Sequence, residues 1–198
     1  MTASARPAIL LDRDGVINEL VPDPATGTPE SPYRPEDVRL VDGAPEALGR
    51  LRRDGWVLVV ISNQPAAAKG IVELTALRQV HERLEELLRE AGSPVDAYRY
   101  CLHHPAGVTA GLSGPCLCRK PAPGLALAAA FELGLDLAAS WVVGDADTDI
   151  EAGRAAGCRT ALVEHRGSSH RRSSGVIPDL RGPSLNAIAD SLPSVRFI

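Results

Sequence analysis

The 198-residue sequence has no long hydrophobic run. Its apolar stretches are far shorter than the roughly 20 residues that cross a bilayer. The first seven residues carry no apolar stretch of signal-peptide length before Asp12. These absences predict a cytoplasmic protein that makes no use of a membrane. The sequence also has no internal repeat, and its length suffices for one hydrophobic core, so we expect a single domain over residues 1–198.

An excess of positive charge is lacking as well. The formal net charge is −4, which disfavours a nucleic-acid-binding protein that depends on overall positive charge. Hydrophobic residues make up 44% and charged residues 23%, as is typical of a globular domain. We expect a monomer whose partner is a small molecule.

Short apolar runs alternate with helical patterns along the chain. Runs over residues 8–11, 56–61 and 141–143 have no polar alternation, which favours strands buried on both faces of a parallel sheet. Residues 98–101 and 160–163 are predicted to form two further strands. Between Leu74 and Leu88 apolar residues recur every three or four positions, and Pro123 and Gly134 bracket an alanine-rich segment, so both segments are predicted to be helical. The alternation predicts an α/β fold with a doubly wound parallel sheet.

Two segments are irregular and polar. Residues 22–35 are rich in proline, threonine, serine and glycine, and residues 165–174 carry His170, Arg171 and Arg172. We expect surface loops in both, the second a solvated, mobile loop without a binding role.

Acidic side chains follow two of the predicted strands directly. Asp12 and Asp14 come after the first strand, Asp145 follows residues 141–143, and Asp149 lies one helical turn later. Ligands of doubly wound sheets bind beyond the carboxyl ends of the strands, so these carboxylates are expected to converge. Their repulsion calls for a cation, and hard oxygen ligands without histidine indicate Mg²⁺.

Three of the four cysteines lie near a histidine. Cys101 and His103 precede Cys116 and Cys118 by a twelve-residue interval that is rich in glycine and proline. Three thiolates and one imidazole form a closed, structural zinc site, with His104 as the alternative fourth ligand. Such a site would fix the loop and thereby Arg119 and Lys120, which follow it directly. Cys158 is expected in the core.

Four segments resemble, in order, the motifs of haloacid dehalogenase phosphatases. Residues 12–18 (DRDGVIN) resemble the first motif, residues 62–64 (SNQ) the second, Lys120 in CRKP the third, and Gly144-Asp145 with Asp149 the fourth. The resemblance implies that Asp12 is the nucleophile, which becomes a phosphoaspartate, and that Asp14 is the general acid and base. It implies Mg²⁺ ligands from Asp12, the Asp14 backbone and Asp145, and it implies that Asp149 supports Asp145 or Lys120.

The same resemblance implies that the transferring phosphate is bound by the second and third motifs, namely by Ser62, Asn63, Gln64 and Lys120. The zinc loop narrows the resemblance to capless, zinc-containing phosphatases that act on heptose bisphosphate or histidinol phosphate. We expect the 7-phosphate of D-glycero-D-manno-heptose 1,7-bisphosphate to be hydrolysed, with Arg119 and the loop over residues 20–34 at the sugar.

Three features depart from that family's pattern, and other functions stay open. Pro65-Ala66 replaces a small residue and glycine, Ala146 replaces a basic residue, and the loop after Asn18 is long. The alternatives are a histidinol-phosphate phosphatase, a phosphatase of DNA ends, which the acidic charge balance disfavours, and a non-catalytic zinc-stapled interaction domain.

Overall fold

A six-stranded sheet forms the centre of the computed structural model, which describes residues 5–23 and 26–195. The strand order is β5-β4-β1-β6-β7-β8, and every neighbouring pair is parallel. The strands are β1 (Ala8–Leu11), β4 (Val57–Asn63), β5 (Ala97–Cys101), β6 (Trp141–Gly144), β7 (Arg159–Val163) and β8 (Leu180–Gly182). The predicted parallel α/β sheet is confirmed.

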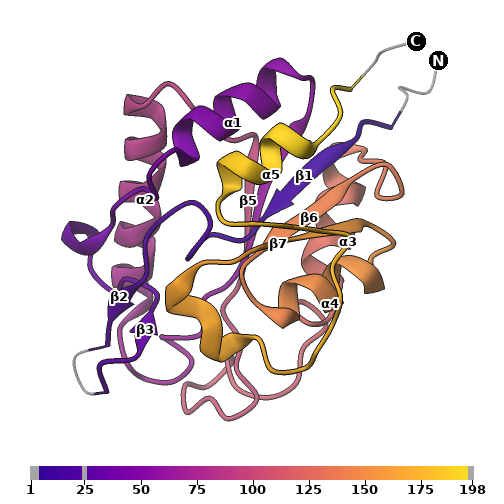
Figure 1. Ribbon diagram of the computed structural model, residues 1–198. Coiled ribbons are helices and arrows are strands. Elements are labelled where there is room, and N and C mark those ends of the chain that lie inside the picture. Colours follow the sequence, from indigo (N-terminus) through magenta and orange to yellow (C-terminus); the bar gives the residue numbers. More distant parts are fainter. Residues whose placement is uncertain (1–4, 24–25, 196–198) are drawn as a thin grey trace.

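Helices cover both faces of this sheet (Figure 1). One face carries α1 (Ala44–Arg53), α2 (Leu74–Glu90) and α5 (Leu185–Ser191). The other face carries α3 (Gly124–Leu133) and α4 (Asp147–Ala155). The sequence patterns correctly indicated α2 and α3, the latter ending at Gly134 with a positive φ of 63°.

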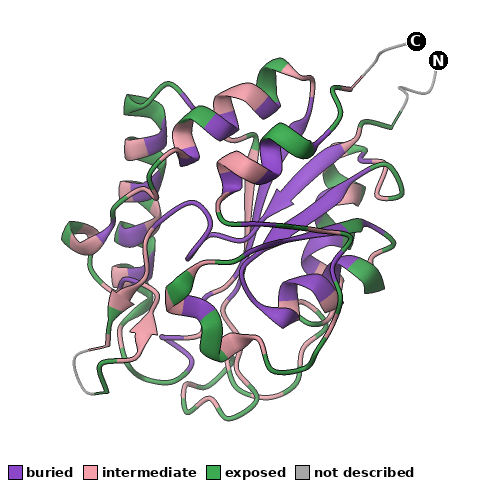
Figure 2. Cartoon of the chain, in the orientation of Figure 1, coloured by how far each residue is buried: buried purple, intermediate pink, exposed green. Residues whose placement is uncertain are grey.

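The central strands are buried on both sides, which explains their continuous apolar runs. In β1, Ile9 and Leu11 pack in the core under α1, α2 and α5, whereas Ala8 and Leu10 pack in the core under α3. Figure 2 shows the sheet and the inward faces of the helices as buried and the outward faces as exposed. The strands therefore form a fixed platform for the residues that follow them.

The carboxyl ends of three central strands lie level. Leu11 of β1 pairs with Val60 of β4 and with Val143 of β6. The backbone N–H of Asp12 continues this alignment by donating to the carbonyl of Val143 at 2.8 Å. Residues just beyond these positions must therefore share one edge of the sheet.

The connections near that edge are short. Between β1 and β4 the chain forms a hairpin of β2 (Val21–Pro22) and β3 (Pro29–Glu30), the 3₁₀ helix η1 (Pro35–Asp37) and α1. Across the described ranges, neither this connection nor the one from β4 to β5 contains a further α/β unit, as expected for a phosphatase without a cap. Within the same ranges no helix is long and apolar enough to span a bilayer.

The segment over residues 165–174 differs from the expectation. It contains a 3₁₀ helix, η2 (Arg166–Arg171), with Ser168 fully buried. The His165 ring accepts a hydrogen bond from the N–H of Gly167 at 3.2 Å, and Arg172 donates to the carbonyls of Val163 and His165. The prediction of an irregular segment was therefore wrong for residues 166–171, whereas Arg166, Ser169 and His170 are exposed as expected. The 3₁₀ helix was missed because polar side chains beside it bind backbone groups that sequence patterns do not reveal.

Candidate active site

Polar residues from several strand ends meet in one cleft of about 310 Å³. Asp12 and Asp14 follow β1, and Ser62 and Asn63 end β4. The predicted residues that line the cleft are Asp12, Asp14, Ser62, Asn63, Arg119 and Lys120. Asp145, which follows β6, is fully buried.

The ammonium group of Lys120 joins two carboxylates inside the protein. Its Nζ lies 2.9 Å from Oδ1 of Asp12 and 2.5 Å from Oδ1 of Asp149, and it donates to the carbonyl of Ile61 at 3.0 Å. Burial by itself lowers the pKa of Lys120, but the charges of Asp12 and Asp149 outweigh burial and raise it. Lys120 is therefore a fixed cation beside Asp12, and it also forms an ion pair with Asp149.

Asp145 has the opposite environment. Within the described part of the chain, neither of its carboxylate oxygens has a hydrogen-bond partner. Burial, with repulsion from Asp12 and Asp149, outweighs the nearby Arg171 charge and the Ser168 hydroxyl group and raises the pKa of Asp145 to about 8. Carboxylate oxygens of Asp12, Asp145 and Asp149 lie within 4.8 Å of one another. An unpartnered buried carboxylate among others fits a hard divalent cation such as Mg²⁺.

Two glycines make room for these carboxylates. A Cβ on Gly15 would lie 2.1 Å from Oδ2 of Asp145, and Gly15 also has a positive φ of 83°. A Cβ on Gly144 would lie 2.2 Å from Cβ of Asp149. Both glycines allow backbone and carboxylate to approach closely, which a larger residue would prevent.

The Asp14 carboxylate is held by several donors. It accepts hydrogen bonds from Nε of Arg13 at 3.0 Å, Nδ2 of Asn18 at 2.8 Å, Nε2 of Gln64 at 2.6 Å and Oγ of Ser31 at 2.8 Å. Burial by itself raises the pKa of Asp14, but the Arg13 charge and the hydrogen bonds from Asn18, Gln64 and Arg13 lower it below its ordinary value. Asp14 is therefore a fixed, ionised carboxylate at the edge of the cleft.

The expected phosphate-binding residues of the second motif separate into two groups. Ser62 lines the cleft, whereas Gln64 lies behind Asp14, where it also accepts a hydrogen bond from Nη2 of Arg13 at 2.8 Å. Asn63 reaches the cleft wall, but its amide bonds both the N–H and the carbonyl of Lys120 at 3.0 Å. The side chains of Asn63 and Gln64 thus position Lys120 and Asp14.

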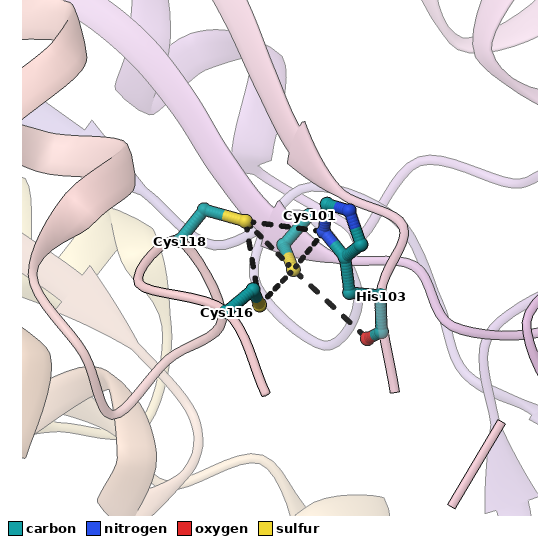
Figure 3. Close-up of side chains that lie close together, drawn as sticks. All are labelled: Cys101, His103, Cys116 and Cys118. Carbon is teal, nitrogen blue, oxygen red and sulfur yellow. Dashed lines mark hydrogen bonds between the residues drawn. The ribbon is translucent and has the colours of Figure 1, made fainter. Parts of the chain in front are cut away.

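The predicted zinc ligands converge, as Figure 3 shows. The Sγ of Cys118 lies 3.2 Å from that of Cys101 and 3.5 Å from that of Cys116, and 3.3 Å from Nδ1 of His103. Ligand atoms around a tetrahedral zinc are separated by about 3.7 Å, which follows from Zn–S bonds near 2.3 Å. The donor set and its compactness fit a structural zinc ion.

Of the two candidate histidine ligands, only one lies in the cysteine cluster, and the loop that carries it also contacts Arg119. His103 lies in the cluster, whereas Nδ1 of His104 accepts a hydrogen bond from the N–H of Ala106. The carbonyl of His103 accepts one from Nη1 of Arg119 at 3.4 Å, so the cluster and the cleft are joined directly. Cys158 is buried in the core near α3, as predicted.

Several residues of the cleft were not singled out from the sequence, although two of them belong to the loop over residues 20–34 that was expected at the substrate. Glu30 and Ser31 reach it from the β2–β3 hairpin, Lys69 from the segment after β4, and Arg171 from η2. Of the expected substrate loop over residues 20–34, positions 24 and 25 lie outside the described residues. These side chains carry no motif, because their role depends on which loops pack together.

Comparison with known proteins agrees with this site. Over 163 residues the chain is 40% identical to the D-glycero-D-manno-heptose-1,7-bisphosphate 7-phosphatase of Thermosynechococcus vestitus, with 80% of this chain and 79% of the relative covered. The chain belongs to the heptose bisphosphate phosphatase family of haloacid dehalogenase-like hydrolases. The corresponding phosphatase of Escherichia coli K12 is 31% identical over 199 residues, covering 98% of this chain and 96% of the relative. The profile of HAD-hydrolase-like proteins matches residues 117–191.

A solved structure of the heptose bisphosphate phosphatase family extends the agreement. The D,D-heptose 1,7-bisphosphate phosphatase of B. bronchiseptica, complexed with magnesium and phosphate, superposes with a TM-score of 0.76 at 30% identity, covering 94% of this chain and 97% of that one. The predicted haloacid dehalogenase fold and family are confirmed, and the chain is a phosphoric monoester hydrolase of that family.

Proposed function

We propose that this protein hydrolyses the 7-phosphate of D-glycero-D-manno-heptose 1,7-bisphosphate through a phosphoaspartate on Asp12. The observation that carries the chemistry is the pairing of Asp12 with a buried cation, Lys120, beside the unpartnered carboxylate of Asp145. The substrate is supported by relatives that cover most of the chain and bear this activity in their names.

Asp12 is the nucleophile in this proposal. It is nearly buried, it lines the cleft, and its backbone is fixed by the sheet. Its carboxylate attacks phosphorus, the P–O bond to the sugar breaks, and the leaving oxygen takes a proton. Lys120, held by Asp149 and Asn63, would stabilise the charge on the transferring phosphoryl oxygens together with the hydroxyl group of Ser62.

Asp14 is the acid and base. The hydrogen bonds from Arg13, Asn18 and Gln64 fix its carboxylate and keep it ionised, as a base toward water requires. An arriving phosphate dianion raises the pKa of Asp14 by repulsion between like charges, which favours the protonated form needed to protonate the leaving oxygen. Ser31, which donates to Asp14, places the β2–β3 hairpin against this group.

Two metal ions complete the proposal. Asp12, the Asp14 backbone carbonyl and Asp145 would hold Mg²⁺, which neutralises the phosphate and the carboxylates when bound. Cys101, His103, Cys116 and Cys118 would hold zinc and keep the loop before Arg119 and Lys120 in place. We further propose a cytoplasmic monomer with one domain over residues 1–198 that binds neither nucleic acid nor membrane.

The second phosphate of the substrate is assigned to Arg119. Its guanidinium lines the cleft and is fixed by the zinc loop, and it can bind a phosphate with two parallel hydrogen bonds. Histidinol phosphate lacks this second anion. We therefore expect at least about a tenfold preference for the bisphosphate, or roughly 1.4 kcal/mol in the transition state.

Competition kinetics with heptose bisphosphate and histidinol phosphate test the assignment. Arg119→Ala should lower the preference more than it slows p-nitrophenyl phosphate cleavage. A tenfold preference for histidinol phosphate would remove the heptose assignment and leave the phosphatase chemistry intact.

A further inference from the structure

The charged side chains that line the cleft beside Asp12, Asp14 and Lys120 form two chemically different groups. Lys69 and Arg119 have no carboxylate within ion-pair distance in the described part of the chain. Both side chains line the same cleft. Arg171, in contrast, forms an ion pair with Glu30 at 3.1 Å. One group is an uncompensated positive charge, and the other is electrically neutral.

The Glu30–Arg171 pair is fixed in place yet accessible. Nη2 of Arg171 donates to the carbonyl of Pro29 at 3.2 Å and to Oε2 of Glu30 at 3.1 Å. Its Nε lies 3.4 Å from Nε2 of His170, while Nη1 has no hydrogen-bond partner among the residues described. The side chains of Arg171 and Glu30 are 23% and 38% exposed, and both line the cleft that contains Asp12.

Such a pair suits neutral polar groups rather than an anion. Because the two charges cancel, the pair attracts a second phosphate much less than Lys69 and Arg119 do. It still offers N–H donors on Arg171 and carboxylate acceptors on Glu30. A sugar hydroxyl both donates and accepts, so adjacent hydroxyls can use both members of the pair at once.

We propose that Glu30 and Arg171 bind hydroxyl groups of the substrate and thereby select a sugar phosphate over other phosphate esters. This inference rests on the proposed function and adds a second determinant to it. Lys69 and Arg119 bind the remote anion, and the Glu30–Arg171 pair binds the sugar. The pair joins the β2–β3 hairpin to η2, so the specificity comes from two segments that lie far apart in the sequence.

The test measures kcat/KM for heptose bisphosphate and for p-nitrophenyl phosphate, which has no hydroxyl groups on its leaving group, at saturating Mg²⁺. Arg171→Gln and Glu30→Gln should each lower the ratio of the two values about tenfold, as expected for the loss of one charge-assisted hydrogen bond to substrate. Arg166→Gln is the matched control: Arg166 is exposed on the same η2 helix and outside the cleft lining. It should leave the ratio unchanged.

Three results would overturn the inference. Unchanged kcat/KM values for both substrates, in both variants, would show that the pair does not contact the sugar. An equal fall for both substrates, with a lower melting temperature, would show that the pair only fastens the hairpin. A wrong heptose assignment would be detected by a different measurement, namely the substrate preference of the wild-type enzyme. In that case the ratio is measured with the hydroxylated ester that the enzyme prefers, and a wild-type enzyme without any such preference also contradicts the inference.

Discussion

Asp145→Asn should abolish magnesium-dependent turnover and yet stabilise the metal-free protein. The carboxylate of Asp145 is fully buried, has no hydrogen-bond partner among the described residues and is repelled by Asp12 and Asp149. These effects raise its pKa from an ordinary value near 3.8 to about 8. In the absence of metal, Asp145 therefore opposes folding at neutral pH.

The size of this effect follows from the pKa difference. Between the ordinary pKa and pH 7, each pH unit lowers the free energy of unfolding by about 1.4 kcal/mol. Asp145 therefore destabilises the metal-free protein at pH 7 by about 4 kcal/mol. Asparagine removes that cost but leaves a buried amide without a partner, which costs about 1–3 kcal/mol. We expect a net stabilisation of about 1–3 kcal/mol, and hence a melting temperature several degrees higher.

Thermal unfolding of zinc-loaded protein without magnesium at pH 7 measures this difference. Asp179→Asn is the control, because Oδ2 of Asp179 accepts hydrogen bonds from N and Oγ1 of Thr160 at 2.8 Å, which lower its pKa. That substitution should lower the melting temperature. If Asp145→Asn melts below the wild type, the description of Asp145 as an uncompensated carboxylate is wrong.

The remaining predictions concern the nucleophile and both metals. Asp12→Asn should abolish hydrolysis of a natural phosphate ester and keep the fold, because the side chains are nearly isosteric; substantial activity would refute the mechanism. Purified protein should hold about one zinc per chain by elemental analysis. The Cys116→Ser variant should lose this zinc, and the Cys158→Ser variant should retain it. A wild-type protein without zinc would contradict the zinc site. Below pH 8 magnesium binding should release a proton from Asp145 and should weaken as the pH falls, because the pKa of Asp145 is about 8 in the metal-free protein. Calorimetry in buffers of different ionisation enthalpy measures this proton release. No proton release would show that Asp145 is not a ligand. For the same reason the free energy of unfolding of the metal-free protein should fall as the pH rises from about 4 to about 8, because the unfolded chain releases the Asp145 proton before the folded protein does. Magnesium should remove this pH dependence.

The sheet and the positions of the motif residues could be predicted because each depends on local sequence. Buried strands need continuous apolar residues, and the polar residues that follow Leu11 and Val143 must reach the same edge once the strands are parallel. The cluster of three cysteines and His103 was predictable for a similar reason, since close pairs of candidate ligands at both ends of one loop need only the loop to close.

The partners of the site residues were less predictable because they come from distant segments. Arg13 lies between two aspartates in the sequence, but its side chain turns inward to Gln64, and its guanidinium lies 5.8 Å from the centre of the Tyr100 ring. Asn63 bonds the backbone of Lys120 rather than standing free in the cleft. Arg171 was assigned to a solvated loop, because nothing in its neighbourhood reveals that Glu30 lies opposite it.

The phosphoaspartate on Asp12 is tested most directly by trapping it in Asp14→Asn. This variant lacks the base for hydrolysis of the intermediate but can still react with p-nitrophenyl phosphate, whose leaving group needs no proton. After rapid acid quenching, mass spectrometry of the peptide that contains Asp12 should show one added phosphoryl group on Asp12, and none in the Asp12→Asn/Asp14→Asn double variant. A quenched Asp14→Asn enzyme that has released p-nitrophenol but carries no phosphoryl group, or carries it on another residue, would contradict the account.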